Sequence, residues 1–200
     1  MIPYRRLSAG LLAAGLLLSP LAAGAQTAPP AAPRTALRFH LIKDGVWYSL
    51  IAEHSGKALA VAADSGDGAP LVQQTPTGGD NQLFRFDQVR SGYFKITVKS
   101  SGKVLEIKDN SLLDHAPVQQ DDWTGQENQM FTLVEDTDGA FQVIVKSSGY
   151  AFDVLGGVGS VGENQQVIVY PPYAAKNHKF KLVEAAPAAA ATAANMGHVP

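Results

Sequence analysis

The stretch FKITVKSSGKVLEI, residues 94–107, decides the fold because its plan occurs three times in the chain. YSLIAEHSGKALAV at 48–61 and FQVIVKSSGYAFDV at 141–154 share alternating apolar residues, a Ser-Gly turn and a second apolar run. The glycines of the three turns are 46 and 47 residues apart. A fixed period of this length indicates a fold built from repeated units.

Each copy also closes in the same way, with an asparagine three residues before a phenylalanine. The closing sequences are NQLF at 81–84, NQMF at 128–131 and NHKF at 177–180, and their asparagines are 47 and 49 residues apart. These landmarks recur in one order and define three repeats over residues 46–184.

Four short strands are expected in each repeat. The run from Phe94 to Val98 alternates apolar and polar residues with the period of two that indicates a half-buried strand. Asp44-Gly45, Ser91-Gly92 and Asp138-Gly139 precede the opening strands, where a hairpin turn favours positive φ. No amphipathic helix longer than one turn is expected.

Three four-stranded units of similar length predict a closed all-β body with pseudo-threefold symmetry, which leaves no sheet edge exposed. The aromatic residues at the strand starts are expected to fill the barrel: Tyr48, Phe84, Phe94, Phe131, Phe141 and Phe180. A thirteenth candidate strand, Leu37 to Ile42, competes with Phe180 to Val183 for the place that closes the barrel.

The first 25 residues are typical of an export signal. Arg5 and Arg6 form the positive region, residues 11–18 are apolar, and Ala23-Gly24-Ala25 is a small-residue cleavage site. We therefore expect residues 1–25 to be a signal peptide and the mature chain to be secreted or periplasmic, with no membrane insertion after cleavage.

Two further segments are predicted to lie outside the folded domain. Residues 26–36 are an Ala/Pro-rich linker, and residues 185–200 are an Ala-rich tail with no apolar periodicity, which we expect to be disordered. The predicted domain covers residues 37–184. With 200 residues in all, the chain has room for one such domain.

Composition excludes several classes of function. The 16 basic and 18 acidic side chains give a net charge of −2, which provides no basic field for nucleic acid, so no nucleic-acid partner is expected. The absence of cysteine removes disulfides, thiol nucleophiles and cysteine-based metal sites. We expect a monomer.

No catalytic motif stands out. The five histidines occur singly, without the spacing of a metal site, and no Gly-x-Ser-x-Gly elbow is present. The glycine-rich stretch 156–162 leads into a strand and so lacks the helix N-terminus that binds phosphate. Asp121 and Asp122 are adjacent, but glycoside hydrolysis needs two acids across a cleft. We predict a non-enzyme with no cofactor and no metal.

The repeat resembles the ricin B-chain-type lectin β-trefoil. The resemblance rests on the Ser-Gly turns and the closing Asn-Gln-x-aromatic motif, and it covers residues 46–184. The family's closing Gln-x-Trp reads Gln82-x-Phe84, Gln129-x-Phe131 and His178-x-Phe180 here. The resemblance implies a β-trefoil of three four-stranded repeats and carbohydrate binding.

In that family a repeat binds sugar through an Asp after the Ser-Gly turn, an aromatic residue on the third strand and the closing Asn. The third repeat matches at Asp153, Tyr170 and Asn177, with His178 in place of Gln. Tyr173 adds a possible second stacking face. An aromatic ring covers the apolar face of a sugar, while carboxylates and amides bind its hydroxyls.

The second repeat matches less well. Glu106 stands at the acid position, Asn128 and Gln129 are present, and Asp121 stands at the aromatic position, with Trp123 two residues further on. A shifted site that uses Trp123 is predicted. In the first repeat Ala60 and the position near Thr75 provide neither group, so no sugar site is expected there.

Alternatives remain open for these residues. Trp123 could cover one end of the barrel, Tyr170 could pack on its own hairpin, and Asp153 could cap a turn. The chain could instead be a trefoil that binds protein, as a hydrolase inhibitor or an envelope scaffold without sugar binding. A degenerate trefoil without a ligand is the third alternative.

Overall fold

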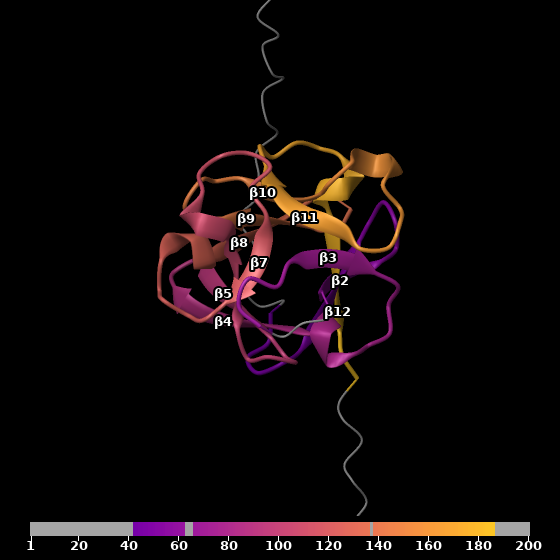
Figure 1. Cartoon of the computed structure of the whole chain (residues 1–200). Coiled ribbons are helices and arrows are strands. Elements are labelled where there is room, and N and C mark those ends of the chain that lie inside the picture. Colours follow the sequence, from indigo (N-terminus) through magenta and orange to yellow (C-terminus); the bar gives the residue numbers. More distant parts are fainter. Residues whose placement is uncertain (1–41, 63–65, 137, 187–200) are drawn as a thin grey trace, which may run out of the picture. The chain divides into compact units, whose positions relative to one another are not determined.

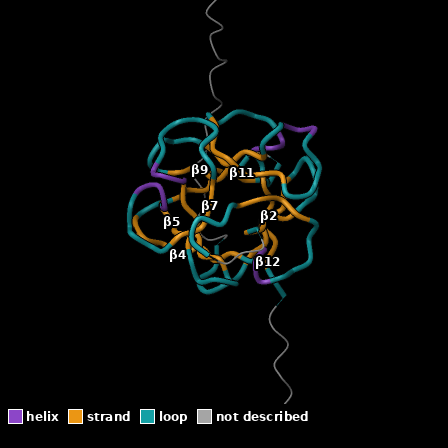
Figure 2. The backbone as a smooth tube through the Cα atoms, viewed as in Figure 1, coloured by secondary structure: helices purple, strands orange, loops and turns teal. Residues whose placement is uncertain are grey.

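The computed structural model describes residues 42–62, 66–136 and 138–186, and the predicted signal peptide, the predicted linker and most of the predicted tail lie outside this part. The described residues form twelve strands joined by turns and three-residue 3-10 helices (Figures 1 and 2). The predicted all-β fold is confirmed, and the described part contains no helix longer than one turn. Within it, no helix is long and apolar enough to cross a membrane.

Four strands belong to each repeat, as the sequence predicts. The first repeat contains β1 (Tyr48–Ala52), β2 (Ala58–Val61), β3 (Leu71–Gln74) and β4 (Phe84–Arg90). The second contains β5 (Tyr93–Val98), β6 (Val104–Ile107), β7 (Val118–Asp121) and β8 (Phe131–Glu135). The third contains β9 (Phe141–Val145), β10 (Ala151–Val154), β11 (Gln165–Tyr170) and β12 (Phe180–Glu184).

The first and last strands of the three repeats form a closed barrel. Antiparallel pairing runs from β1 through β4, β5, β8, β9 and β12 back to β1. In this ring β12 pairs with β1 along its whole length, from Tyr48 opposite Glu184 to Ala52 opposite Phe180. The barrel is therefore closed by β12. Ile42 is not part of a strand, and residues 37–41 lie outside the described part.

The register of the barrel repeats three times. Phe84 lies opposite Tyr48, Phe131 opposite Phe94, and Phe180 opposite Phe141. All six rings belong to the central core, as predicted. Full burial of one such ring contributes about 1.5–3 kcal/mol.

The second and third strands of each repeat form a hairpin outside the barrel. The hairpins β2–β3, β6–β7 and β10–β11 contact each other through antiparallel pairs: Pro70 with Gln119, Pro117 with Ile168, and Gln165 and Gln166 with Gln73 and Val72. These contacts join the three repeats in a second ring.

The loop of each hairpin crosses onto the hairpin of the next repeat. The amides of Gly68, His115 and Asn164 donate to carbonyls of β7, β11 and β3 at 2.9, 2.8 and 2.8 Å. All three residues have a positive φ, of 76°, 60° and 58°. The loop that precedes β7 in the second repeat thus lies against the third repeat.

Candidate functional site

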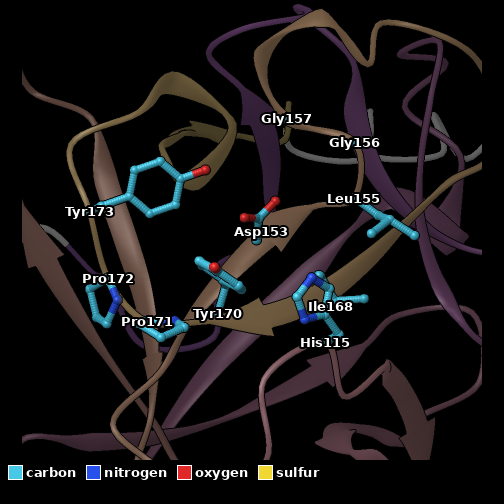
Figure 3. Close-up of a pocket in the computed structure, with 10 residues that line it drawn as sticks. All are labelled: His115, Asp153, Leu155, Gly156, Gly157, Ile168, Tyr170, Pro171, Pro172 and Tyr173. Carbon is cyan, nitrogen blue, oxygen red and sulfur yellow. The ribbon is translucent and has the colours of Figure 1, made fainter. Parts of the chain in front are cut away.

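A pocket of about 530 Å³ opens at the β10–β11 hairpin of the third repeat (Figure 3). One of its residues, His115, comes from the second repeat. The others come from β10, β11 and the loops that follow them: Asp153, Leu155, Gly156, Gly157, Ile168, Tyr170, Pro171, Pro172 and Tyr173. Two repeats therefore build this site.

Asp153 lies at the centre of the pocket wall, between Tyr173 and Leu155 in Figure 3. Asn177 Nδ2 donates to Asp153 Oδ1 at 2.8 Å. His178 Nε2 lies 2.6 Å from Oδ2, although the geometry of this contact is not that of a hydrogen bond. Asn177 and His178 are 1% and 0% exposed. Two buried side chains thus fix the direction of the carboxylate.

Two tyrosines form the aromatic part of the pocket. The rings of Tyr170 and Tyr173 meet edge to face at 6.0 Å, and Tyr173 is 42% exposed. The Tyr173 hydroxyl accepts a hydrogen bond from Asn177 Nδ2 at 3.2 Å and points toward Asp153 in Figure 3. Since Asn177 is the donor in that bond, the hydroxyl proton of Tyr173 remains available to a ligand.

The third repeat replaces a hydrogen-bonded pair with a pair of rings. In the first two repeats the glutamine Oε1 of the closing motif accepts from a threonine amide, Thr77 to Gln82 at 2.7 Å and Thr124 to Gln129 at 2.8 Å. At the same two positions the third repeat has Tyr173 and His178, whose ring centroids lie 3.9 Å apart. This exchange places a phenol beside Asp153.

The closing asparagine also changes its partner in the third repeat. Asn81 Nδ2 donates to the carbonyl of Val61 at 3.1 Å, and Asn128 Nδ2 donates to that of Ile107 at 3.0 Å. Asn177 donates to side chains of the pocket instead. The first two asparagines connect turn to strand, and the third orients the site.

In the second repeat the acidic group is already engaged by its neighbours. Glu106 Oε1 accepts from Gln119 at 2.9 Å, and Oε2 accepts from Gln129 at 3.1 Å. Gln129 is fully buried and also donates to the carbonyl of Asp122 at 2.7 Å. Glu106, Asn128 and Gln129 are close together, and their polar atoms face the protein.

Trp123 lies in the loop that follows β7 and is 38% exposed. Lys95 Nζ lies 5.6 Å from the centre of its ring, a cation–π contact. Trp123 is not one of the residues that line the pocket of the third repeat. A role for it in the second repeat stays a prediction.

In the register that the structure shows, the first repeat has neither the acid nor the aromatic residue of the predicted sugar site. Tyr170 lies opposite Ala151, and the corresponding pairs are Val104 with Asp121 and Ala58 with Gln74. The position of the aromatic residue is therefore Gln74, one residue before the position near Thr75 that the sequence indicated.

Comparison with known proteins identifies the family. The model of the "ricin-type beta-trefoil lectin domain-like" family matches residues 35–121 and 80–170. The chain belongs to this family. No curated protein matches it significantly.

Solved structures of β-trefoils agree with the assignment. ThreeFoil, a designed threefold-symmetric protein, is 37% identical with a TM-score of 0.66, over 68% of this chain and 97% of ThreeFoil. An exo-β-1,3-galactanase from Clostridium thermocellum is 28% identical with a TM-score of 0.68, over 72% of this chain. The match spans only 31% of the galactanase.

A third structure supports the fold alone. A Macrolepiota procera ricin B-like lectin in complex with lactose is 15% identical with a TM-score of 0.61, over 70% of this chain and 96% of the lectin. The predicted recognition and fold class, a ricin-type lectin β-trefoil, are confirmed.

Sequence reasoning on this ricin-type trefoil missed His115. Its ring meets Tyr170 edge to face at 5.1 Å, and it lines the pocket. A search for sites within single repeats treats it as an isolated, solvated histidine. Alignment of the three hairpin loops, which places it with Gly68 and Asn164, is the signal that could have found it.

Charge in the pocket of this trefoil comes from few groups. Among its lining residues Asp153 alone has a carboxyl group, and none is a lysine or arginine. His115 Nδ1 lies 3.5 Å from Asp114 Oδ1. In the described part of the chain no group of three or more His, Asp or Glu residues is placed to hold a metal ion.

Proposed function

We propose that the pocket of the third repeat binds carbohydrate and that the chain is a non-catalytic glycan-binding protein. Membership of the ricin-type lectin-like family supports carbohydrate binding in general. The observation that carries the proposal for this pocket is the oriented carboxylate of Asp153 beside the exposed ring of Tyr173. Asp153, Tyr170 and Tyr173 are the residues proposed to contact the sugar.

The chemistry of a sugar ring fits these groups. The carboxylate of Asp153 accepts hydrogen bonds from two neighbouring hydroxyls, and the Tyr173 hydroxyl donates to a third. The faces of Tyr170 and Tyr173 cover the C–H side of the ring. Asn177 and His178, both buried, act as positioning residues behind the carboxylate.

A neutral sugar suits the pocket better than an acidic one. No lysine or arginine lines it, and Asp153 would repel a carboxylate or sulfate on the ligand. The galactanase acts, as its name states, on β-1,3-galactan, and the Macrolepiota lectin holds lactose. Galactose-containing glycans are therefore the first probes.

The third repeat is proposed to bind more strongly than the second. A sugar at Glu106 would have to displace the hydrogen bonds from Gln119 and Gln129, which occupy both carboxylate oxygens. Asp153 also has Asn177 and His178 at its two oxygens, so the difference lies in the pocket, which Asp153 lines and Glu106 does not. We expect a dissociation constant in the millimolar to high micromolar range, roughly −4 to −6 kcal/mol, for one shallow site.

The proposal includes no hydrolytic role for this pocket. Glycosidases place two carboxyl groups on opposite sides of the bond that breaks, and Asp153 is the sole carboxylate among the lining residues of the described chain. Binding without chemistry is the function that this arrangement supports.

A glycan array tests the proposed function. Residues 26–200 are compared with Asp153→Asn and with Glu106→Gln, the same change of acid to amide in the second repeat. We expect the wild type and Glu106→Gln to bind the same glycans, and Asp153→Asn to lose at least tenfold in signal because the charged acceptor is gone.

Two results would contradict the proposal. A folded wild type that binds no glycan would favour the protein-binding alternative, an inhibitor or scaffold. Equal binding by wild type and Asp153→Asn would move the site away from the third repeat. Competition by free sugar separates true binding from adhesion to the array.

We also propose that the protein is exported, as a secreted or periplasmic protein. The support is the sequence of residues 1–25. N-terminal sequencing of protein recovered from the periplasm or medium should begin at Gln26. An intact N-terminus on cytoplasmic protein would contradict export.

A further inference from the structure

The pocket extends beyond the groups that one sugar ring would use. Its volume of about 530 Å³ lies within the range of sites for ligands larger than a single hexose. Asp153 and Tyr173 form one side. His115 and Leu155 lie on the other side in Figure 3 and are absent from the sugar-binding set that the sequence predicted.

His115 reaches the pocket from a different repeat. The loop before β7 crosses onto β11 because the amide of His115 donates to the carbonyl of Val169 and the amide of Val169 donates to that of Ala116, at 2.8 and 3.0 Å. The imidazole then meets Tyr170 edge to face, and its side chain stays 58% exposed. The backbone at His115 is therefore held against β11, and the ring is open to solvent beside Tyr170.

The backbone at His115 favours a smaller residue. Its φ of +60° lies in the left-handed region, where Gly68 and Asn164 stand at the corresponding positions of the other two hairpin loops. Glycine adopts this conformation without steric cost, and asparagine and histidine adopt it more readily than most other residues. The second repeat thus has its imidazole at a place where the fold does not require one.

Apolar surface continues the pocket on the same side. Leu155 is 39% exposed, although it lines the pocket. Gly156 and Gly157 follow it and carry no side chain that would cover the ligand. A ring with hydroxyls on its edge and C–H groups on its face fits between an imidazole, which both donates and accepts, and an exposed leucine.

We infer that His115 contacts the ligand and that the site binds a disaccharide or a longer glycan. The terminal sugar lies at Asp153, Tyr170 and Tyr173, and the next unit lies against His115 and Leu155. This inference rests on the proposed function, because it places its second unit beside the sugar bound at Asp153.

The chain itself provides the variant that tests this contact. His115→Gly introduces the residue that stands at Gly68 and relieves the positive φ, so the domain should fold with an equal or higher melting temperature. Asn164→Gly changes the corresponding backbone position outside the pocket and serves as the matched control. Titration calorimetry uses two ligands. Methyl β-galactoside occupies only the subsite at Asp153, whereas lactose also occupies the subsite at His115.

The wild type should bind lactose more tightly than methyl β-galactoside. His115→Gly should weaken lactose binding by roughly three- to tenfold, the value of one ring contact, and leave methyl β-galactoside binding unchanged. Asn164→Gly should bind both as the wild type does. Asp153→Asn should lose binding of lactose and of methyl β-galactoside.

The outcomes separate this inference from the function on which it rests. Unchanged lactose binding in folded His115→Gly, together with loss in Asp153→Asn, overturns the second subsite and leaves the sugar site intact. A wild type that binds both ligands equally overturns it as well. A wild type that binds neither ligand overturns the inference for galactosides, and the glycan array then decides whether the proposed function fails with it.

Discussion

Asp153 and Glu106 occupy the same place on corresponding strands, yet their surroundings give them different roles. Glu106 accepts two hydrogen bonds from glutamine side chains and thereby stabilises its own repeat. Asp153 is held from behind by Asn177 and His178 and lines the pocket. Glu106 is one methylene longer than Asp153 and has different neighbours, and these differences make Glu106 a structural acid and Asp153 a candidate ligand-binding acid.

The closing asparagines provide a prediction at this scale. Asn128→Ala removes a buried hydrogen bond to the carbonyl of Ile107 and should cost about 1–3 kcal/mol in the free energy of unfolding, with sugar binding unchanged. Asn177→Ala removes the donors to Asp153 and Tyr173, so it should also weaken binding at least tenfold.

Chemical denaturation and glycan titration of both variants check this difference. If Asn177→Ala binds as well as Asn128→Ala does, Asn177 does not orient the site, and its match to the family motif is only structural.

At the scale of elements, the loops between the second and third strands connect neighbouring repeats. Glu163, in the loop before β11, accepts from Thr75 Oγ1 at 2.7 Å and from the Thr75 amide at 3.0 Å, and it also pairs with Lys57. The hydrogen bonds from Lys57 and then from Thr75 lower the pKa of Glu163 to about 2. This carboxylate links the third repeat to the first.

The lowered pKa predicts an effect of acid on stability. A carboxylate whose pKa is lower in the folded state stabilises the fold above its unfolded pKa of about 4.3 and loses that contribution as the pH falls toward 2. Glu163→Gln should therefore lower the melting temperature at pH 7 and make it less dependent on pH between 5 and 2. Thermal melts across this range measure the effect.

A control for the acid effect comes from a carboxylate elsewhere in the chain. Asp44→Asn changes an exposed acid in the turn before β1, and its melting temperature should follow the wild-type pH dependence. If Glu163→Gln shows the same pH dependence as Asp44→Asn, the link between the third and first repeats does not contribute to acid stability.

For the whole molecule, threefold pseudosymmetry makes the three closing phenylalanines equivalent. Phe84, Phe131 and Phe180 lie opposite Tyr48, Phe94 and Phe141 and are at most 1% exposed. Each change to alanine should cost about 3–5 kcal/mol in the free energy of unfolding. Urea denaturation of the three variants checks this, and a much smaller cost for Phe180 would contradict closure of the barrel by β12.

The sequence predicted the fold well because the repeat places the same side chains at the same barrel positions three times. Tyr48 and Phe94 have identical spacing to the Ser-Gly turn, and a period of two then determines which side of each strand faces the core. The competing strand before Tyr48 was harder to exclude, because a short run of apolar and polar residues such as LRFHLI at 37–42 carries no information about its partner strand.

The candidate site was less predictable because part of it is not local. Asp153 and Tyr170 follow from the family motif, and hairpin register brings them together. His115 becomes a neighbour of Tyr170 only through the crossing of one loop onto the next repeat, a contact 55 residues away in sequence. The contact between the rings of Tyr173 and His178 is also visible only in the structure, since the sequence shows only that these two residues differ from the Thr and Gln of the other repeats.

A crystal structure with a bound glycan tests the central claim most directly. Crystals of residues 26–200 soaked with lactose, or with the strongest glycan from the array, would show where the sugar lies. We predict one ring in the pocket of the third repeat, with a hydroxyl oxygen about 2.5–3.0 Å from an Asp153 carboxylate oxygen and the ring against Tyr170 or Tyr173. Sugar bound beside Trp123 or in the first repeat, with the third pocket empty, would contradict the account.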